Sequence, residues 1–373
     1  MIRTGIVDLG LHEGHVPPWL LSRMRRLADA IICLLVGEYG TTGALAKLSD
    51  CFWFQALAAV LGFDFDSSGV TSVTCGVLKA AVKPSEHGIG VAGGKGKLSK
   101  QTPKEITSLA ELFGLPDAAK ERMVYSSRMA AKVDNAAVQD GYQLYHHAFF
   151  LSEKGDWAII QQGMNPDLGL ARRYHWASKE VKSFVVEPHG AIIGQARHRK
   201  VLNMTAKESE GARKASVDLA KDLNSLRRER FKLVSPSQAS LDEWLGGAKV
   251  KVSCGSFIPS RINWKALERV YDFSPRNYEE LLAVRGVGPS TVRALALISE
   301  LIYGEKPSWR DPVKFSWAFG GKDGVPYPVN VKTMDEAVEF LSDAIKQASL
   351  ENGEKAKALR RLKSFTVSRA EPI

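Results

Sequence analysis

Two strand-forming runs joined by a polar turn constrain the fold of this chain more than any other feature of its sequence. Residues 142–151 and 156–162 are rich in aromatic and β-branched side chains, and residues 152–155 supply a polar turn that ends in Gly. This pattern predicts a β-hairpin. Short apolar pieces at residues 184–186 and 192–193 predict further strands. We therefore expect an antiparallel sheet near the middle of the chain.

Amphipathic helices are expected before this sheet. In residues 17–36 apolar side chains recur every three or four positions, and residues 52–61 and 77–82 also have a helical pattern. Residues 102–112 begin with Thr-Pro and have a Glu three positions after the Thr, which is typical of a helix start. Helices and strands in separate stretches predict an α+β fold, with a mixed α/β domain over residues 1–195.

The composition changes after this domain. Residues 200–232 contain good helix formers, a single Gly and no Pro, which predicts a long helix. Residues 197–232 hold eleven Lys and Arg against five Asp and Glu, so the helix is basic. A charge run of this kind is usually a solvated face, and we also interpret it as a surface that follows phosphates. The basic helix and a linker are assigned to residues 196–260, and a helical domain to residues 261–373.

The chain as a whole is also basic. Its 373 residues carry 51 Lys and Arg against 41 Asp and Glu, a net charge of +10. Such a surface attracts polyanions, and nucleic acid is the commonest large one. The four cysteines are far apart and the longest apolar run has seven residues, so neither a disulfide scaffold, a zinc ribbon nor a membrane span is expected. The N-terminal residues lack the pattern of a secretory signal, which favours a cytoplasmic location.

The most informative motif lies at residues 271–304. Two helical runs, residues 275–284 and 291–303, flank the tripeptide Gly286-Val287-Gly288. Glycines permit a tight turn between the helices, and the second helix would present its free N–H groups there. These groups suit one backbone phosphate, and such a contact carries no base information.

This motif resembles the helix-hairpin-helix module of DNA repair proteins, which include base-excision glycosylases, nucleases and ligases. The module has the pattern Leu-x-x-x-Gly-apolar-Gly-x-x-Thr-apolar-x-Ala, and the matching positions here are Leu282, Gly286, Val287, Gly288, Thr291, Val292 and Ala294. The resemblance implies binding of double-stranded DNA that is largely independent of sequence, with RNA left open. Lyase-type glycosylases of this class have a Lys where this chain has Ser290, so the resemblance disfavours a lyase mechanism. An ordinary helix pair closed by a Gly-rich turn is the alternative.

Further phosphate contacts are expected from basic residues outside the hairpin. Lys95 and Lys97 lie in a Gly-rich stretch that lacks the spacing of a nucleotide-binding P-loop, and we interpret them as a flexible basic strip. The candidate nucleic-acid-binding residues are Arg285, Gly286, Val287, Gly288, Ser290, Thr291, Arg293, Lys95, Lys97, Arg172, Arg173, Arg197, Arg199 and Lys200.

A polar cluster upstream of the hairpin is the candidate chemical centre. Strand periodicity places Tyr145 and His147 on one face of the sheet and His146 on the other. Asp134, Asp140 and His147 are candidate ligands of a Mg²⁺ or Mn²⁺ ion that would polarise a phosphate and activate a water. The alternative is a set of turn caps and half-buried strand residues. The candidate catalytic residues are Asp134, Asp140, His146, His147, Gln161 and Gln162, with the glutamines expected to orient the water or the phosphate.

Nearly the whole chain resembles a prokaryotic, mainly archaeal family of proteins of unknown function. The stretches that carry this resemblance are residues 3–20, 92–97 and 134–162 together with the hairpin at Gly286. The resemblance implies no activity, so three hypotheses stay open. The leading one is a metal-dependent nuclease in DNA repair or recombination, and the others are a non-catalytic architectural or adaptor protein that binds DNA and a base-excision glycosylase.

Overall fold

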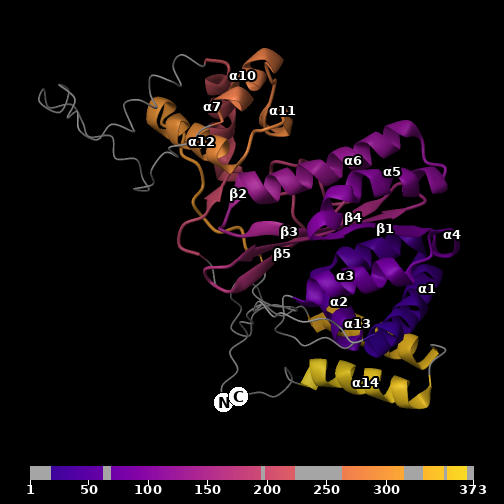
Figure 1. Cartoon of the computed structure of the whole chain (residues 1–373). Coiled ribbons are helices and arrows are strands. Elements are labelled where there is room, and N and C mark those ends of the chain that lie inside the picture. Colours follow the sequence, from indigo (N-terminus) through magenta and orange to yellow (C-terminus); the bar gives the residue numbers. More distant parts are fainter. Residues whose placement is uncertain are drawn as a thin grey trace, which may run out of the picture.

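The computed structural model describes residues 18–61, 69–194, 198–222, 263–314, 331–347 and 351–367. A five-stranded sheet in the order β1-β3-β4-β5-β6 forms its centre, and every neighbouring pair of strands is antiparallel (Figure 1). The strands are β1 (Ile89–Lys95), β3 (Gln143–Ser152), β4 (Trp157–Asn165), β5 (Leu170–Ala177) and β6 (Ala191–Ile193). Strands β3 and β4 are the predicted hairpin, which is confirmed.

Helices cover both faces of this sheet (Figure 1). The helices on one face are α1 (Pro18–Ser49), α2 (Cys51–Leu61) and α3 (Gly69–Ala81), and those on the other are α5 (Thr102–Leu112) and α6 (Asp117–Lys132). A short helix, α4 (Pro84–His87), leads into β1, and a 3-10 segment, η1 (Gly96–Gln101), leads out of it. Helices α13 (Val331–Gln347) and α14 (Asn352–Val367) pack against α2. The predicted α+β fold is confirmed.

Alternation along the strands gives each face of the sheet its own apolar layer. Ala148, Phe150 and Ile160 belong to the layer under α1, α2 and α3. Phe149 and Ile159 belong to the layer under α5 and α6. Because both faces are covered, His146 and His147 on β3 and Gln161 and Gln162 on β4 are buried.

Helix α1 combines length with an apolar composition. Within the described residues, Leu20–Ser49 is the one stretch long and apolar enough to cross a membrane by those two criteria, which buried helices of soluble proteins also meet. Gly40 interrupts its helical backbone with φ of 68°. Met24, Ile31 and Leu35 are buried in the layer against the sheet. In this structure α1 is therefore a core helix.

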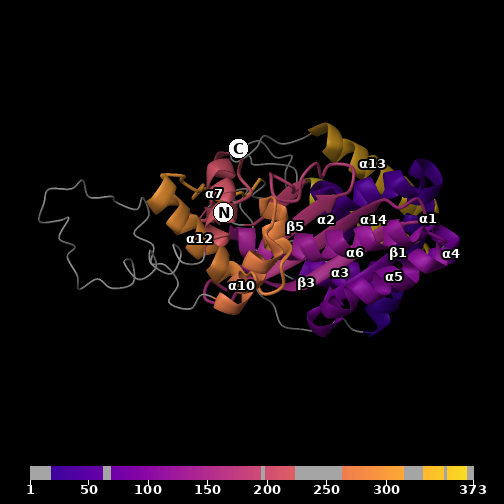
Figure 2. The same cartoon turned by 90° about the horizontal axis from the view of Figure 1, so that it is seen from above.

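A helical unit lies at one end of the sheet, beyond the C-terminal end of α6 (Figures 1 and 2). Its helices are α7 (Glu210–Ala220), α10 (Trp264–Phe273), α11 (Tyr278–Ala283) and α12 (Pro289–Tyr303). The connection from α6 is the π-helical turn η2 (Val133–Ala137), followed by β2 (Val138–Gln139), which pairs with β7 (Leu202–Asn203). The apolar residues of this unit form one continuous cluster with the layer under α5 and α6.

Three local predictions were wrong. The described part of the expected long basic helix is β7, the 3-10 turn η3 (Lys207–Ser209) and the eleven-residue helix α7, because Leu202 and Asn203 pair with β2. Residues 184–186 form turns instead of a strand, and the Phe184 ring stacks on Trp157. The helix expected from residue 275 begins three residues later, because Ser274 ends α10 in the left-handed conformation and Asn277 caps α11 (Tyr278–Ala283).

The packing of α1 predicts a clear difference between two of its neighbouring residues. Ile31 is fully buried, so Ile31→Ala should lower the free energy of unfolding by about 2–5 kcal/mol. Cys33 is exposed, so Cys33→Ala should change it by less than about 0.5 kcal/mol. Urea denaturation followed by circular dichroism measures both. Equal, small effects would show that this helix is not part of the folded core in solution.

Candidate functional site

The hairpin between α11 and α12 has the backbone that its glycines suggest. Gly286 has φ of 96°, a conformation that side chains rarely adopt. A Cβ atom at this position would lie 2.6 Å from Nη2 of Arg269 and 3.1 Å from Cβ of Ala266. Val287 is buried at 1% exposure between the helices, as expected from its place in the motif. The turn therefore requires Gly at position 286 for both conformation and space.

Helix α12 starts without a side-chain cap. Gly288 is its N-cap residue and Pro289, which has no N–H group, is its first residue. The N–H groups in the first turn of a helix have no acceptor within the helix, which leaves those of Ser290 and Thr291 available to an anion. Ser290 is exposed and the Thr291 side chain is buried. The positive end of the helix dipole is thus presented to solvent at this point.

The other side of the turn is fixed to the sheet domain. Lys132, at the end of α6, donates hydrogen bonds from Nζ to the carbonyl oxygens of Val287 (2.5 Å) and Val284 (3.2 Å). Burial lowers the pKa of this amine. Gln139 donates from Nε2 to Pro289 O at 2.8 Å and accepts from Nε of Arg293 at 2.8 Å. Lys132 and Arg293 therefore position the hairpin, and Arg293 is only half-exposed.

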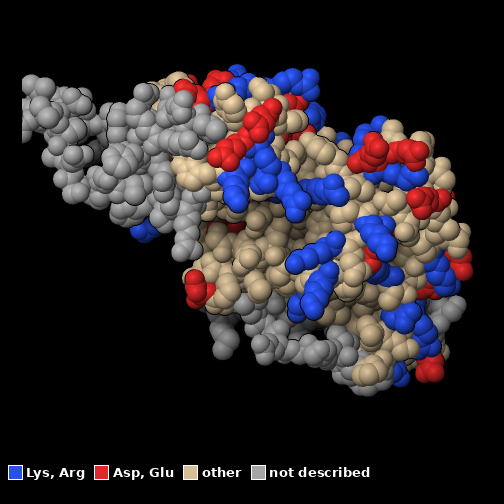
Figure 3. Space-filling model, turned by 45° about the horizontal axis from the view of Figure 1, so that its top comes forward, with Lys and Arg blue, Asp and Glu red and all other residues tan. Residues whose placement is uncertain are grey.

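Exposed cations lie at the outer side of the turn and at the end of β1. Arg285 lies in the turn, and Arg269 and Lys265 lie on α10 beside it. Lys95, Lys97 and Lys100 are exposed at the end of β1 and in η1. Figure 3 shows Lys and Arg side chains gathered on the face between the helical unit and the sheet. Sequence reasoning missed Arg269 and Lys265, although their place on an amphipathic helix next to the hairpin was a usable signal.

The remaining basic candidates divide into exposed and buried residues. Arg199 and Lys200 are exposed, while Arg197 lies outside the described residues. Arg172 and Arg173 are buried, at 0% and 1% exposure, so their assignment to a nucleic-acid-binding surface is corrected. Both lie on β5, which is covered on its two faces, and that placement removes them from any duplex.

Arg172 joins three distant parts of the chain. It binds Asp311 with two hydrogen bonds of 2.9 Å and Asp140 with a third of 2.9 Å. Asp140 also accepts hydrogen bonds from the Tyr174 hydroxyl and from the Tyr142 N–H group. Burial raises the pKa of Asp140, which shares one guanidinium with a second carboxylate. Asp140 is therefore committed to an internal ion pair.

Asp134 belongs to a different buried network. Its Oδ2 accepts hydrogen bonds from Gln161 and from Trp176 Nε1, and its Oδ1 accepts from His189 Nε2. Gln161 in turn contacts Nδ1 of His147 at 2.8 Å. Nε2 of the same ring lies 2.9 Å from the Ser127 hydroxyl. Sequence reasoning grouped Asp134, His147 and Gln161 but did not include His189, which is 55 positions from Asp134 along the chain.

His146 and Gln162 lie on the opposite face of the sheet, next to each other across β3 and β4. The irregularity in β3 between Leu144 and His146 shifts the alternation, and Gln162 donates a hydrogen bond to the Tyr145 hydroxyl. Tyr145 is thus on the side of His146, and the prediction that it shares a face with His147 was wrong. The six candidate catalytic residues are divided among three separate environments.

The candidate metal ligands do not converge. Asp134 and Asp140 use their carboxylates in separate hydrogen-bond networks. Within the described ranges, no group of three His, Cys, Asp or Glu residues is arranged to hold a metal ion. Burial is the main cause that lowers the pKa of His147 to about 4. The arrangement is that of a hydrogen-bonded protein interior, so these residues do not fit the Mg²⁺ or Mn²⁺ site expected from the sequence.

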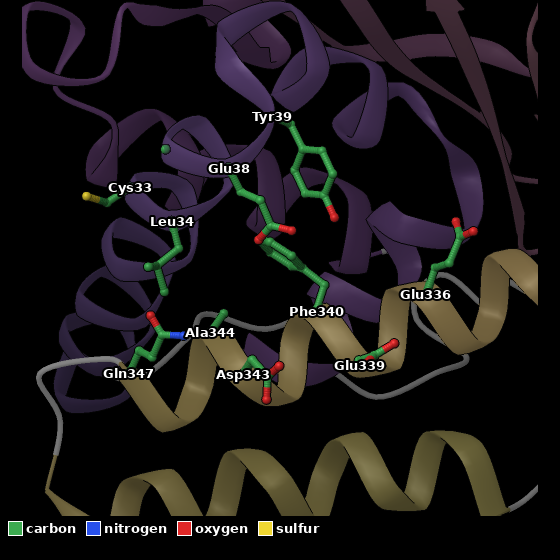
Figure 4. A pocket seen from close by; sticks show the side chains of 11 residues that line it. Cys33, Leu34, Glu38, Tyr39, Glu336, Glu339, Phe340, Asp343, Ala344 and Gln347 are labelled. Atoms are coloured by element: carbon green, nitrogen blue, oxygen red, sulfur yellow. The ribbon is translucent and has the colours of Figure 1, made fainter.

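A surface pocket of about 720 Å³ lies between α1 and α13, away from the hairpin. Figure 4 shows Glu38, Glu336, Glu339 and Asp343 around it, together with Tyr39. Carboxylates dominate its charge, so it does not extend the basic face.

Comparison with known proteins assigns the chain to a family. The model of the family described as "Protein of unknown function (DUF763)" matches residues 5–329. The chain therefore belongs to this family, which covers the sheet domain and the hairpin. No curated protein and no solved structure matches the chain.

The buried histidines predict a pH dependence of stability. Burial, followed by His147 and Lys95, lowers the pKa of His146 to about 3, whereas an unfolded His has a pKa of about 6.5. The unfolded chain therefore binds more protons between these values, and stability is lost as pH falls from about 6.5. His146→Leu should make this loss less steep by up to about 1.4 kcal/mol per pH unit.

Urea denaturation at pH 7.5, 5.5 and 4.5 tests this expectation. Neither ring nitrogen of His146 has a hydrogen-bond partner in the described part of the chain, so the variant breaks no side-chain hydrogen bond there and should remain folded at pH 7.5. A pH dependence that is unchanged in the variant would contradict a neutral, buried His146.

Proposed function

We propose that this protein binds double-stranded DNA through backbone phosphates, with the hairpin turn as a central contact. One observation carries the proposal. The uncapped start of α12 and the exposed Arg269 and Arg285 lie together at one turn. Neither arginine forms an ion pair with a described carboxylate. N–H groups, a helix dipole and free guanidinium groups in one place favour a phosphate.

The binding should tolerate many sequences. Contacts of this type meet phosphate oxygens and leave the base edges unread. The exposed Lys95, Lys97 and Lys100 add positive charge at the end of β1, and Figure 3 shows several Lys and Arg side chains on the face between the helical unit and the sheet, so we expect contacts with more than one phosphate. Neutralising several phosphates releases counterions, so the affinity should fall steeply with added salt.

The site residues favour binding over cleavage. Asp134, Asp140 and His147 are buried and engaged with protein partners, which leaves them poorly placed to meet a scissile phosphate. We therefore place the non-catalytic DNA-binding hypothesis ahead of the metal-dependent nuclease. Metal-dependent cutting of plasmid DNA by the wild-type protein in Mg²⁺ or Mn²⁺ would reverse this order.

Ser290 offers the sharpest test of the phosphate contact. A carboxylate in the first turn of α12 interacts favourably with the helix dipole, so Ser290→Glu should leave the protein folded. The same carboxylate would repel a phosphate, and the affinity for duplex DNA should fall by about tenfold or more. The slope of log K against log salt should become shallower by about 0.9.

Ser290→Gln is the matched control because it has nearly the same size without the charge. Its affinity for duplex DNA should be within about threefold of that of the wild-type protein, since Gln carries no charge that would repel a phosphate. Fluorescence anisotropy with a labelled duplex between 50 and 200 mM salt measures all three proteins. Equal affinity of the Glu and Gln variants would remove the turn from the DNA interface, and tighter binding of a matched RNA would redirect the proposal to RNA.

The two glycines of the turn should respond differently to Ala. Gly286→Ala places Cβ against Arg269 at a positive φ and should lower both stability and DNA affinity. A Cβ at Gly288 has no atom within 4 Å, so Gly288→Ala should lower the free energy of unfolding by no more than about 1 kcal/mol, the usual cost of Ala at an N-cap. Thermal denaturation and anisotropy compare the two variants. Wild-type stability and affinity in Gly286→Ala would show that the turn does not depend on this conformation.

A further inference from the structure

A second cluster of polar residues lies buried between the sheet and helices α2 and α3, apart from the hairpin. Arg173 is its central member, on the face of β5 opposite to Arg172. Its Nη2 donates to Oε1 of Gln55 at 2.9 Å, and its guanidinium carbon lies 4.9 Å from the centre of the Phe54 ring. Nε and Nη1 have no acceptor in the part of the chain that the structure describes.

Nothing described around Arg173 balances its positive charge. Gln55 and Phe54 are neutral. The nearby Cys51 and Cys75 are buried. Burial raises the pKa of both thiols, that of Cys75 to about 12. Both are therefore neutral thiols at physiological pH. Arg172, one position earlier, differs because it binds two carboxylates.

Other buried polar atoms in this layer also have no hydrogen-bond partner within the described residues. His175 follows Arg173 on the same face of β5 and donates from Nδ1 to Ser49 O at 2.8 Å, while its Nε2 has no partner within the described residues. The same is true of the hydroxyls of Thr71 and Thr74 on α3, both at 0% exposure. His175 is two positions from Arg173 on β5, and burial, together with the charge of Arg173, lowers the pKa of His175.

We infer that Arg173 is the centre of a buried oxyanion-binding site that takes the phosphate group of a small ligand. A buried cation without a counter-charge is strongly unfavourable, and a bound anion removes that cost. Guanidinium N–H groups match phosphate oxygens better than any other side chain. The site differs from the hairpin because Arg173 is buried at 1% exposure, which excludes a duplex.

Thermal stability in the presence of orthophosphate and of adenosine 5′-monophosphate, at constant ionic strength set with chloride, tests this inference on the full chain. A ligand that binds only the folded state stabilises it, and at about 100 times its Kd the melting temperature should rise by at least about 2 °C. A rise in melting temperature with orthophosphate alone indicates a site for free phosphate. A rise with adenosine 5′-monophosphate alone indicates a site for a nucleotide. Either response must be absent in Arg173→Met, which keeps an unbranched, flexible side chain but removes the guanidinium group and its charge.

The controls separate this site from the hairpin and from a structural role. Ser290→Glu should keep the wild-type response, because its change is confined to the hairpin. Arg173→Met without added anion should melt at or above the wild-type temperature, since it removes an uncompensated buried charge. No stabilisation by either probe, or equal stabilisation of the wild type and Arg173→Met, would overturn the inference. A destabilised Arg173→Met that still responds to phosphate would do the same.

Discussion

The shared ion pair of Arg172 holds the architecture together. Arg172 lies on β5, while its partners Asp140 and Asp311 follow β2 and α12. A single side chain therefore connects the sheet to both ends of the helical unit. Asp311 also accepts hydrogen bonds from the N–H groups of His198 and Val313. Removing one member of such a buried group leaves the others uncompensated, which typically costs about 3–5 kcal/mol. The position of the hairpin relative to the sheet depends on this junction and on the contacts of Lys132.

Local structure was predictable because its signals are local. The hairpin of β3 and β4 follows from residue types and a turn, and helix α5 follows from the Thr-Pro start at Thr102. The Gly-Val-Gly turn was also readable, since Gly286 and Val287 need no distant partner to explain them. The long basic helix failed because helix propensity was weighed without the strand partner of Leu202 and Asn203.

The candidate chemical centre was only partly predictable because burial of polar groups is decided by distant partners. Arg172 pairs with Asp311 across 139 positions, and Asp134 with His189 across 55. A sequence shows that such residues are polar, but it does not show that two layers of helices cover the strands that carry them. Polar side chains on a strand covered on both faces either complete a network, as Gln161 does, or remain without partners, as Nε of Arg173 does.

Lys132 gives the turn an electrical polarity. Its amine draws the carbonyl oxygens of Val284 and Val287 toward the protein interior, so the negative ends of these peptide groups face inward. The N–H groups at the start of α12 are left facing outward with no carbonyl to offset them. An amine on the inner side of the turn thereby helps to set the electrostatic potential that a ligand meets on the outer side. The electrostatic potential outside the turn thus depends partly on a side chain that lies on its inner side.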